Sequence, residues 1–395
     1  MKKILLFLTI AIALPLVVMA QSPPRPTPAP PRGLPTPAAP TLGANSYILV
    51  DFNSGHVLVE SNPDMPVEPA SITKVMTSYV VFTELAGGNI QLSDAVTVSE
   101  TAWRTGGSRM FIEPSMQPTI EELLKGMVIQ SGNDASVALA EHLAGTEEAF
   151  AELMNHYASQ MGMTNSHFMN STGLPHEQHF TTARDVAILS AALIRDFPEY
   201  YRWYSEKEYS FNNIRQHNRN NLLWRDPAVD GLKTGHTEAA GYCLAASAKR
   251  DGMRLISVVL GSGSESSRVN QSQSLLNYGF RFFETIQLYK AGQELAQGKV
   301  WKGEADQIRL GIESELFVTI PRGRYEDLDA QVEMRPELIA PLTQGDEVGQ
   351  ISIRLEDSEI TSRGLIALES VPEAGFLGRT WDGMSMWFGG LFEDD

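Results

Sequence analysis

Three short motifs of serine and lysine follow one another along the chain, and their residue types suit acyl transfer. They are Ser71-Ile72-Thr73-Lys74, Ser131-Gly132-Asn133 and Lys233-Thr234-Gly235. In this order they are the signature of a serine acyl-transferase whose base is a lysine rather than a histidine. Each motif alone is weak, because about one Ser-x-x-Lys match is expected by chance in a chain of this length. The prediction therefore depends on the local structure around all three.

The first motif pairs a nucleophile with a base. Ser71 and Lys74 are three residues apart at the start of a predicted helix, so their side chains share one face and can meet. Serine is a poor nucleophile until a base takes its proton. A lysine can act as that base only if burial or a second cation destabilises its ammonium form, and Lys233 could supply that cation. The helix amino terminus also disfavours positive charge. Taken alone, the motif is better explained by a capping serine and a solvated lysine.

The second motif lies between two predicted helices, where a loop can project side chains into a cleft. Ser131 could relay a proton between Lys74 and a departing amine, and Asn133 could hydrogen-bond the backbone of a substrate. The alternative is a turn that caps the next helix, since Ser-Gly-Asn is common in loops.

The third motif opens a predicted strand. If that strand lies at a sheet edge, it can pair with an extended peptide, while Lys233 and Thr234 face the peptide's carboxylate. Gly235 leaves room for close approach. The alternative is a surface strand with an exposed lysine. Because three separate sites agree on one chemistry, we prefer the catalytic interpretation for all of them.

Hydrophobic periodicity predicts the elements that position these motifs. Two strand-like runs joined by a turn come first, several helices follow, and an apolar hairpin and a last helix close the domain. The expected strands are 46–52, 56–60, 241–248 and 253–260; the expected helices begin at Ser71 and after the capping box Thr119–Glu122, cover 134–143, 147–161 and 182–194, and end with one that closes near Phe283. Strands flanking a run of helices predict an α/β (α+β) domain over residues 45–285 with a mainly antiparallel sheet.

From about Ile286 the pattern changes to short apolar runs separated by turn residues. Ile351 and Ile353 alternate with polar neighbours, as in a strand with one buried face. No helical stretch of note intervenes. We therefore expect a second, smaller, all-β domain over residues 286–371.

The amino-terminal region carries targeting and spacer signals. Residues 1–20 combine Lys2 and Lys3, an apolar run and a small-residue cleavage site, which predicts a signal peptide removed before Gln21. The alternative, an uncleaved anchor, is disfavoured because the apolar run is shorter than the ~20 residues that a span needs. Residues 21–44 are rich in proline and should form an extended linker.

The carboxy-terminal segment, residues 372–395, is predicted to be an amphipathic helix. Leu377, Trp381 and Phe388 fall on one helical stripe. Aromatic residues on a short helix suggest that it lies in a membrane interface. The alternative is a helix docked on its own β domain, because the terminal Glu393-Asp394-Asp395 would be repelled by anionic lipid.

Composition excludes some functions. The formal net charge of -17 argues against nucleic acid as a partner, because little in the chain would neutralise phosphates. Cys243 is the single cysteine, so an intramolecular disulfide is impossible. Its apolar surroundings predict a buried, inert thiol.

Beyond the three motifs, further segments make the chain similar to one family. It resembles the D-alanyl-D-alanine carboxypeptidases of the low-molecular-mass penicillin-binding proteins, in the group that has a second β domain. The matching segments are Pro69-Ala70-Ser71, Gly107-Ser108-Arg109-Met110-Phe111, Asn218-Arg219-Asn220 and the run from Val229 to Thr237. The resemblance extends from about Asn45 to the carboxy terminus. It implies a penicillin-binding-protein/β-lactamase-like transpeptidase domain followed by the small β domain.

The resemblance also implies an activity and a setting. The expected reaction is removal of the terminal D-Ala from peptidoglycan stem pentapeptides, with neither cofactor nor metal, in the biogenesis of the cell wall. Penicillin and other β-lactams would mimic the substrate and leave a stable acyl-serine. The expected location is periplasmic, with peripheral attachment to the outer face of the cytoplasmic membrane.

Residue roles follow from the same resemblance. Ser71 would be the nucleophile and Lys74 the general base, while Ser131 and Lys233 would serve proton transfer and recognition of the substrate carboxylate. Arg219 resembles the arginine that helps to hold that carboxylate. The backbone N–H groups of Ser71 and His236 would form the oxyanion hole. The residues expected to bind substrate are Lys233, Asn133, Thr234, Gly235, His236 and Arg219.

Four other functions share some of these sequence features. A serine β-lactamase of the commonest class would carry a glutamate at about 161–173, and that segment has none. An endopeptidase that cuts cross-links stays open, although such relatives usually lack the β domain. The intact Lys74, Ser131 and Lys233 argue against a catalytically weak protein that docks partners through its β domain. A metalloenzyme is disfavoured, because His176 and His179 lack the helical spacing of zinc peptidases.

Overall fold

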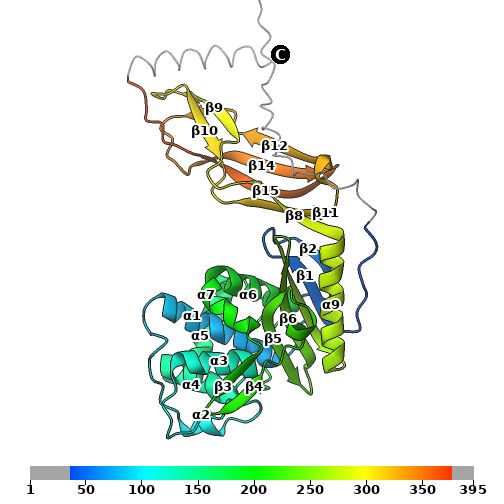
Figure 1. The fold of residues 1–395 in the computed structure, drawn as a ribbon. Coiled ribbons are helices and arrows are strands. Elements are labelled where there is room, and N and C mark those ends of the chain that lie inside the picture. Colours follow the sequence, from blue (N-terminus) through cyan, green and yellow to red (C-terminus); the bar gives the residue numbers. More distant parts are fainter. Residues whose placement is uncertain (1–35, 376–395) are drawn as a thin grey trace, which may run out of the picture. The chain divides into compact units, whose positions relative to one another are not determined.

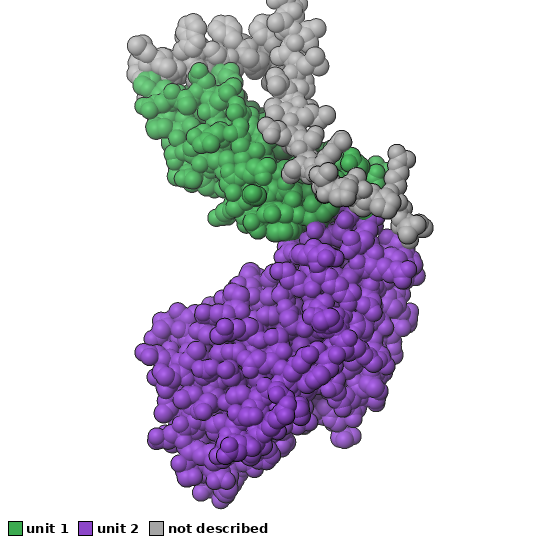
Figure 2. Space-filling model, in the orientation of Figure 1, with its two compact units in different colours: residues 1–33, 286–318, 323–395 green, residues 34–285, 319–322 purple. Residues whose placement is uncertain are grey.

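The computed structural model describes residues 36–375, which form two compact units. Figure 2 colours them separately: one holds residues up to Thr285 together with Thr319–Arg322, and the other holds the remainder from Ile286 onward. The predicted signal peptide, the predicted linker before residue 36 and residues 376–395 of the predicted carboxy-terminal helix lie outside the described residues. Residues 372–375, where that helix was expected to begin, are not helical. Between residues 36 and 375, no helix has the length and apolar character needed to cross a membrane.

A five-stranded antiparallel sheet forms the centre of the first unit. Its strand order is β2-β1-β7-β6-β5. The strands are β1 (Ser46–Asp51), β2 (Val57–Ser61), β5 (Val229–Thr237), β6 (Gly241–Arg250) and β7 (Met253–Ser262). Strand β5, which carries the third motif, is at the edge of the sheet, as the peptide-pairing interpretation requires. The strand begins four residues before Lys233, so the motif lies within it rather than opening it.

Helices cover both faces of this sheet, and Figure 1 shows α9 on one side and the helical cluster on the other. The strands are buried on both faces: Ile256 and Val258 join one apolar core, while Leu255 and Val259 join the second. This explains their nearly continuous apolar sequence. The helices are η1 (Ala70–Thr73), α1 (Lys74–Ala86), α2 (Glu100–Arg104), α3 (Ile120–Gln130), α4 (Asn133–Ala144), α5 (Glu147–Gln160), α6 (Ala183–Asp196), α7 (Pro198–Tyr201), η2 (Arg202–Ser205), α8 (Leu222–Arg225) and α9 (Glu265–Phe282).

Most expected helices are confirmed, and the capping box at Thr119 and Glu122 is formed in full. The first motif differs, because Ser71 lies in the 3-10 turn η1 and the α-helix starts at Lys74. A small hairpin was not predicted: β3 (Glu208–Phe211) and β4 (Ile214–His217) pair around Asn212 and Asn213. Both asparagines have positive φ, of 47° and 60°, as a tight hairpin turn requires.

The second unit is built from strands, which confirms the all-β prediction. Its six-stranded sheet has the order β12-β14-β15-β10-β9-β13, and β8 pairs separately with β11. Ile351 and Ile353 are buried, in agreement with their alternation in the sequence. Two elements, β8 (Phe283–Tyr289) and β11 (Leu316–Pro321), have residues in both units. The others are β9 (Ala296–Trp301), β10 (Gln307–Gly311), η3 (Tyr325–Asp327), β12 (Leu328–Met334), β13 (Leu338–Ile339), β14 (Glu347–Leu355) and β15 (Ser358–Ala367).

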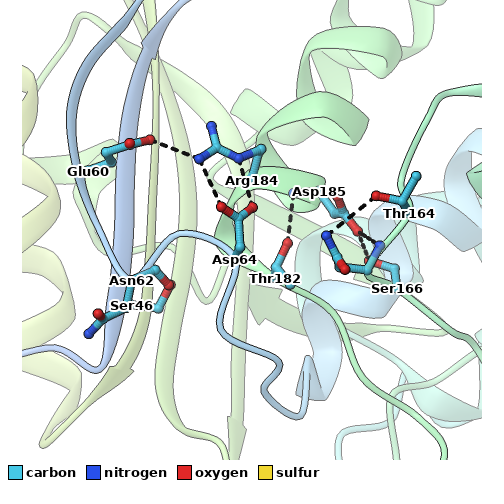
Figure 3. Close-up of polar contacts among 10 residues, drawn as sticks. Ser46, Glu60, Asn62, Asp64, Thr164, Ser166, Thr182, Arg184 and Asp185 are labelled. Atoms are coloured by element: carbon cyan, nitrogen blue, oxygen red, sulfur yellow. Dashed lines mark hydrogen bonds and ion pairs between the residues drawn. The ribbon is translucent and has the colours of Figure 1, made fainter.

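Two charged residues at the start of α6 tie this helix to its neighbours. Arg184 donates to Asp64 at 2.8 and 3.0 Å and to Glu60 at 3.1 Å, and these side chains are partly exposed (Figure 3). Exposed ion pairs contribute little to stability, because water screens them and the long side chains must be ordered.

Asp185, the next residue, is buried. Its carboxylate accepts hydrogen bonds from the backbone N–H of Asn165 at 2.9 Å and from Ser166 Oγ at 2.7 Å. The side chain of Thr182 caps α6 by accepting from the N–H of Asp185 at 3.1 Å (Figure 3). Together these bonds fix both ends of the segment 165–182, which enters the site described below.

Substitution of Asp185 should therefore lower the stability of the fold much more than substitution of Arg184. We expect Asp185→Ala to lower the free energy of unfolding by about 2 kcal/mol, because it removes a buried carboxylate that accepts hydrogen bonds from Asn165 and Ser166. Arg184→Ala should cost less than about 1 kcal/mol. Urea unfolding of both variants measures the difference, and equal losses would contradict this account.

Candidate active site

The segment that carries Ser71 is held tightly from two sides. Ala70 has a positive φ of 47°, and Gly173 is packed so closely that a Cβ there would lie 1.7 Å from the Ala70 carbonyl oxygen. On the other side, a Cβ on Gly235 would lie 2.9 Å from the carbonyl oxygen of Pro69. Because Gly235 has no side chain, the backbone turn that precedes Ser71 can pack closely against β5.

Lys74 is fully buried and its ammonium group has three hydrogen-bond acceptors. Nζ donates to Ser71 Oγ at 3.2 Å, to Asn133 Oδ1 at 2.6 Å and to the Thr172 carbonyl oxygen at 2.6 Å. The first and second motifs therefore meet at one nitrogen atom. Thr172 completes the group from a loop 98 residues further along the chain.

Burial lowers the pKa of Lys74 to about 7, while the negative charges of Glu147 and Asp134 oppose this shift. Lys233, the second cation that the sequence suggested as a cause, is not among the causes of this shift; instead, the charge of Lys74 acts on Lys233. The pKa of Lys233 lies well below its usual value because of burial first and the charge of Lys74 second. Near neutral pH a large share of Lys74 is thus unprotonated and able to accept a proton from Ser71.

The second motif contributes a hydroxyl without a partner and an amide that makes two hydrogen bonds. Ser131 has a left-handed backbone, with φ of 70°, and its buried Oγ has no hydrogen-bond partner among residues 36–375. Asn133 accepts from Lys74 and donates from Nδ2 to the carbonyl oxygen of Gly106 at 2.6 Å. Asn133 therefore positions Lys74, and the second N–H of its Nδ2 is still available for the predicted contact with a substrate backbone.

The third motif brings positive charge to the sheet edge. Lys233 and Thr234 are buried, and Lys233 Nζ donates to the Thr234 carbonyl oxygen at 3.1 Å. Arg219 is exposed at the mouth of a cavity of about 470 Å³. Its charge and that of Arg268 further lower the pKa of Lys233. This concentration of cations suits a carboxylate ligand.

Arg268 on α9 is a residue that sequence reasoning missed. Its buried guanidinium donates to the carbonyl oxygens of Gly235 at 3.0 Å and Cys243 at 3.4 Å, so it supports β5 from behind. The predicted inert thiol is confirmed, since burial raises the pKa of Cys243 to about 11. His236 is exposed, and the centroid of its ring lies 4.1 Å from the centroid of the Tyr242 ring.

His179 is a second missed residue, and it lies behind the first motif. Its Nδ1 accepts from the backbone N–H of Met169 at 3.3 Å, so Nε2 carries the proton and donates to Thr73 Oγ1 at 2.9 Å. Burial lowers the pKa of His179 to about 4, which keeps it neutral. In the part of the chain that the structure describes, no cluster of histidine, cysteine and carboxylate side chains is suited to a metal ion.

Comparison with known proteins agrees with this geometry. The family model "D-alanyl-D-alanine carboxypeptidase" matches residues 34–264, and the model "penicillin-binding protein 5, C-terminal domain" matches residues 283–373. The chain therefore belongs to the D-alanyl-D-alanine carboxypeptidase family, as the sequence motifs predicted.

Individual relatives support the same assignment. The chain is 45% identical over 365 residues to D-alanyl-D-alanine carboxypeptidase DacA of Escherichia coli K12, covering 89% of this chain and 91% of that protein. It is 47% identical over 366 residues to DacC of the same organism, covering 90% and 92%. The crystal structure of penicillin binding protein 5 from Haemophilus influenzae aligns with a TM-score of 0.83 at 42% identity, covering 85% of this chain and 99% of that one. The protein is a D-alanyl-D-alanine carboxypeptidase, a penicillin-binding serine peptidase that acts on peptidoglycan.

The buried His179 predicts a loss of stability in mild acid. Its folded-state pKa of about 4 lies below the ordinary value of 6.5, so the unfolded state binds the proton more readily. The contribution is fully present above pH 6.5 and is lost as the pH falls toward 4. Between pH 7 and pH 5 the loss should be about 2 kcal/mol.

Urea unfolding of wild type and His179→Gln at both pH values tests this. The variant should be less stable at pH 7, because Thr73 and Met169 lose their partner, yet it should lose about 2 kcal/mol less than wild type on acidification. Parallel losses in both proteins would show that other groups cause the acid sensitivity.

Proposed function

We propose that Ser71 is the nucleophile of this carboxypeptidase and Lys74 its general base. The observation that carries the proposal is the 3.2 Å contact between Lys74 Nζ and Ser71 Oγ, made by a lysine whose pKa is about 7. A base with a pKa near the working pH combines a useful unprotonated fraction with sufficient proton affinity.

The substrate is the terminal D-Ala-D-Ala of a peptidoglycan stem pentapeptide. Ser71 Oγ attacks the carbonyl carbon of the penultimate D-Ala, and its proton passes to Lys74 Nζ. The backbone N–H groups of Ser71 and His236 donate to the resulting oxyanion. When the C–N bond breaks, the leaving amine takes a proton by way of the Ser131 hydroxyl, which has no other buried partner in the described structure. Water then hydrolyses the acyl-serine and frees the enzyme.

The terminal carboxylate of the substrate is held at the positive end of the site. Lys233 and Arg219 supply charge, and Thr234 and Gly235 lie on the free edge of β5, where an extended peptide can add as a strand. A β-lactam carries its carboxylate and reactive carbonyl in a similar arrangement. It would acylate Ser71 and block the next step.

We therefore expect the chain from Gln21 onward to release D-Ala from a pentapeptide and to bind labelled penicillin at Ser71. Ser71→Ala should abolish both activities, a loss of at least about 10³-fold, because no nucleophile replaces the hydroxyl. Ser274→Ala, which removes an exposed serine from α9, is the matched control and should leave both unchanged.

Mass spectrometry of the penicillin adduct locates the acylated residue. An adduct on another residue, or retained D-Ala release in Ser71→Ala, would overturn the proposal. A cross-linked tetrapeptide in the same assay tests the endopeptidase alternative directly, since that activity would cleave the cross-link at a comparable rate.

We further propose that the protein works in the periplasm, attached to the outer face of the cytoplasmic membrane through residues 376–395. The support is the signal-peptide pattern of residues 1–20 and the aromatic stripe that includes Trp381. Residues 372–374 belong to the β domain, because Pro372 accepts from Glu304 N–H and Ala374 donates to the Lys302 carbonyl.

Truncation should therefore be made after Gly375. We expect full-length protein in the membrane fraction and the truncated protein in the soluble periplasmic fraction, with equal penicillin binding per molecule. Fractionation and labelling measure both quantities. Equal solubility of the two proteins would mean that the segment does not anchor the chain.

A further inference from the structure

The acceptor opposite Ser71 on the buried ammonium group comes from the loop before α6. The carbonyl oxygen of Thr172 lies 2.6 Å from Lys74 Nζ. Asn170 shapes this loop, since its Oδ1 accepts from the N–H groups of Thr172 at 3.2 Å and Gly173 at 2.7 Å. The position of Lys74 therefore depends on how the loop is held.

Ser171 links this loop to the helices around it. Its carbonyl oxygen accepts from Thr77 Oγ1 at 2.7 Å and from Ser136 Oγ at 2.9 Å. Its own N–H and Oγ both donate to Glu147 Oε1, at 2.9 and 2.6 Å. Ser171 is completely buried, so Glu147 satisfies two donors that would otherwise have no partner.

Glu147 combines this contact with a charge. It is the first residue of α5, directly after the capping Thr146, where the helix dipole favours a carboxylate. Its negative charge stabilises the ammonium form of Lys74. Other titratable groups also lie near Lys74: its charge lowers the pKa of Lys233, and neutral His179 lies behind Thr73.

Asp134 is the second carboxylate near Lys74, but it already has a structural task. It accepts from the backbone N–H groups of Met110 at 2.9 Å, Phe111 at 2.8 Å and Ile112 at 3.3 Å. Glu147, by contrast, is connected to Lys74 through one loop. It accepts hydrogen bonds from Ser171, and the carbonyl oxygen of the next residue, Thr172, accepts from Lys74 Nζ.

We propose that Glu147 is a positioning residue of the acyl-transfer reaction. By holding Ser171 it fixes the adjacent Thr172 carbonyl on Lys74, and its charge balances the buried ammonium. The inference rests on the proposed role of Lys74 as base. No sequence motif pointed to Glu147.

Two substitutions separate the contact from the charge. Glu147→Gln keeps an oxygen that can accept from Ser171 but removes the negative charge. The ammonium form of Lys74 loses a stabilising partner, so the unprotonated base persists to lower pH. Glu147→Ala removes both, leaving buried donors of Ser171 unpaired and the Thr172 carbonyl loosely held.

The experiment follows acylation by a fluorescent penicillin from pH 5 to 9. Wild type should show a rise in the acylation rate with an inflection near pH 7. In Glu147→Gln this rise should move to lower pH, so that the rate at pH 5.5 is about threefold above wild type while the plateau is similar. Glu147→Ala should lower the plateau by about tenfold, with rescue in the glutamine variant.

Glu148→Gln is the matched control, because Glu148 is the exposed neighbour in the same helical turn. It should leave the profile unchanged. A Glu147→Gln profile that coincides with wild type, or one that Glu148→Gln reproduces, overturns the proposal, as does a uniform loss at every pH that follows lost thermal stability. A wild-type rate without the inflection near pH 7 would instead overturn the role of Lys74 as base.

Discussion

The burial of the Lys74 ammonium is the constraint on which the site depends. A cation taken out of water is costly unless every proton finds an acceptor. Here three acceptors from three separate segments surround one nitrogen atom: Ser71, Asn133 and Thr172. Each segment must be held in place for the lysine to be tolerated. Burial of the side chain lowers its proton affinity, as a general base for serine needs, whereas the three acceptors stabilise its protonated form.

The groups around Lys74 are themselves held in place by further contacts within the first unit. The turn before Ser71 leaves no space for a side chain on Gly173 or Gly235. Behind it, neutral His179 binds Thr73, and Glu147 fixes the loop that supplies the third acceptor. Polar groups in such a network depend on one another, since removing one leaves its partner unpaired in a medium of low polarity. The residues of the site are therefore part of the packed interior of the first unit.

Much of this architecture was predictable because its signals are local. The capping box at Thr119, the alternation of Ile351 and Ile353, and the apolar runs of β6 and β7 each report their environment within a few residues. The three motifs could be placed for the same reason. Their placement also identified the family correctly.

The missed features depend on contacts between distant segments. Arg268 reaches the carbonyl of Gly235 across 33 residues, and Thr172 reaches Lys74 across 98. Both acceptors are backbone carbonyl oxygens, and because every residue has one, no residue type in the sequence indicates them. The hairpin at Asn212 and Asn213 is different. Two adjacent asparagines are a local turn signal, so this hairpin could have been predicted from the sequence.

The position of β5 at the sheet edge has a consequence for solubility. A strand with one unpaired side is a template for any extended chain, including a second copy of the same protein. Proteins commonly protect such edges with charge, and here the exposed Arg219 lies close enough to β5 for its charge to act on Lys233. Two copies that met edge to edge would bring their Arg219 side chains toward one interface, and the repulsion would oppose aggregation. A peptide that ends in a carboxylate would meet no such barrier.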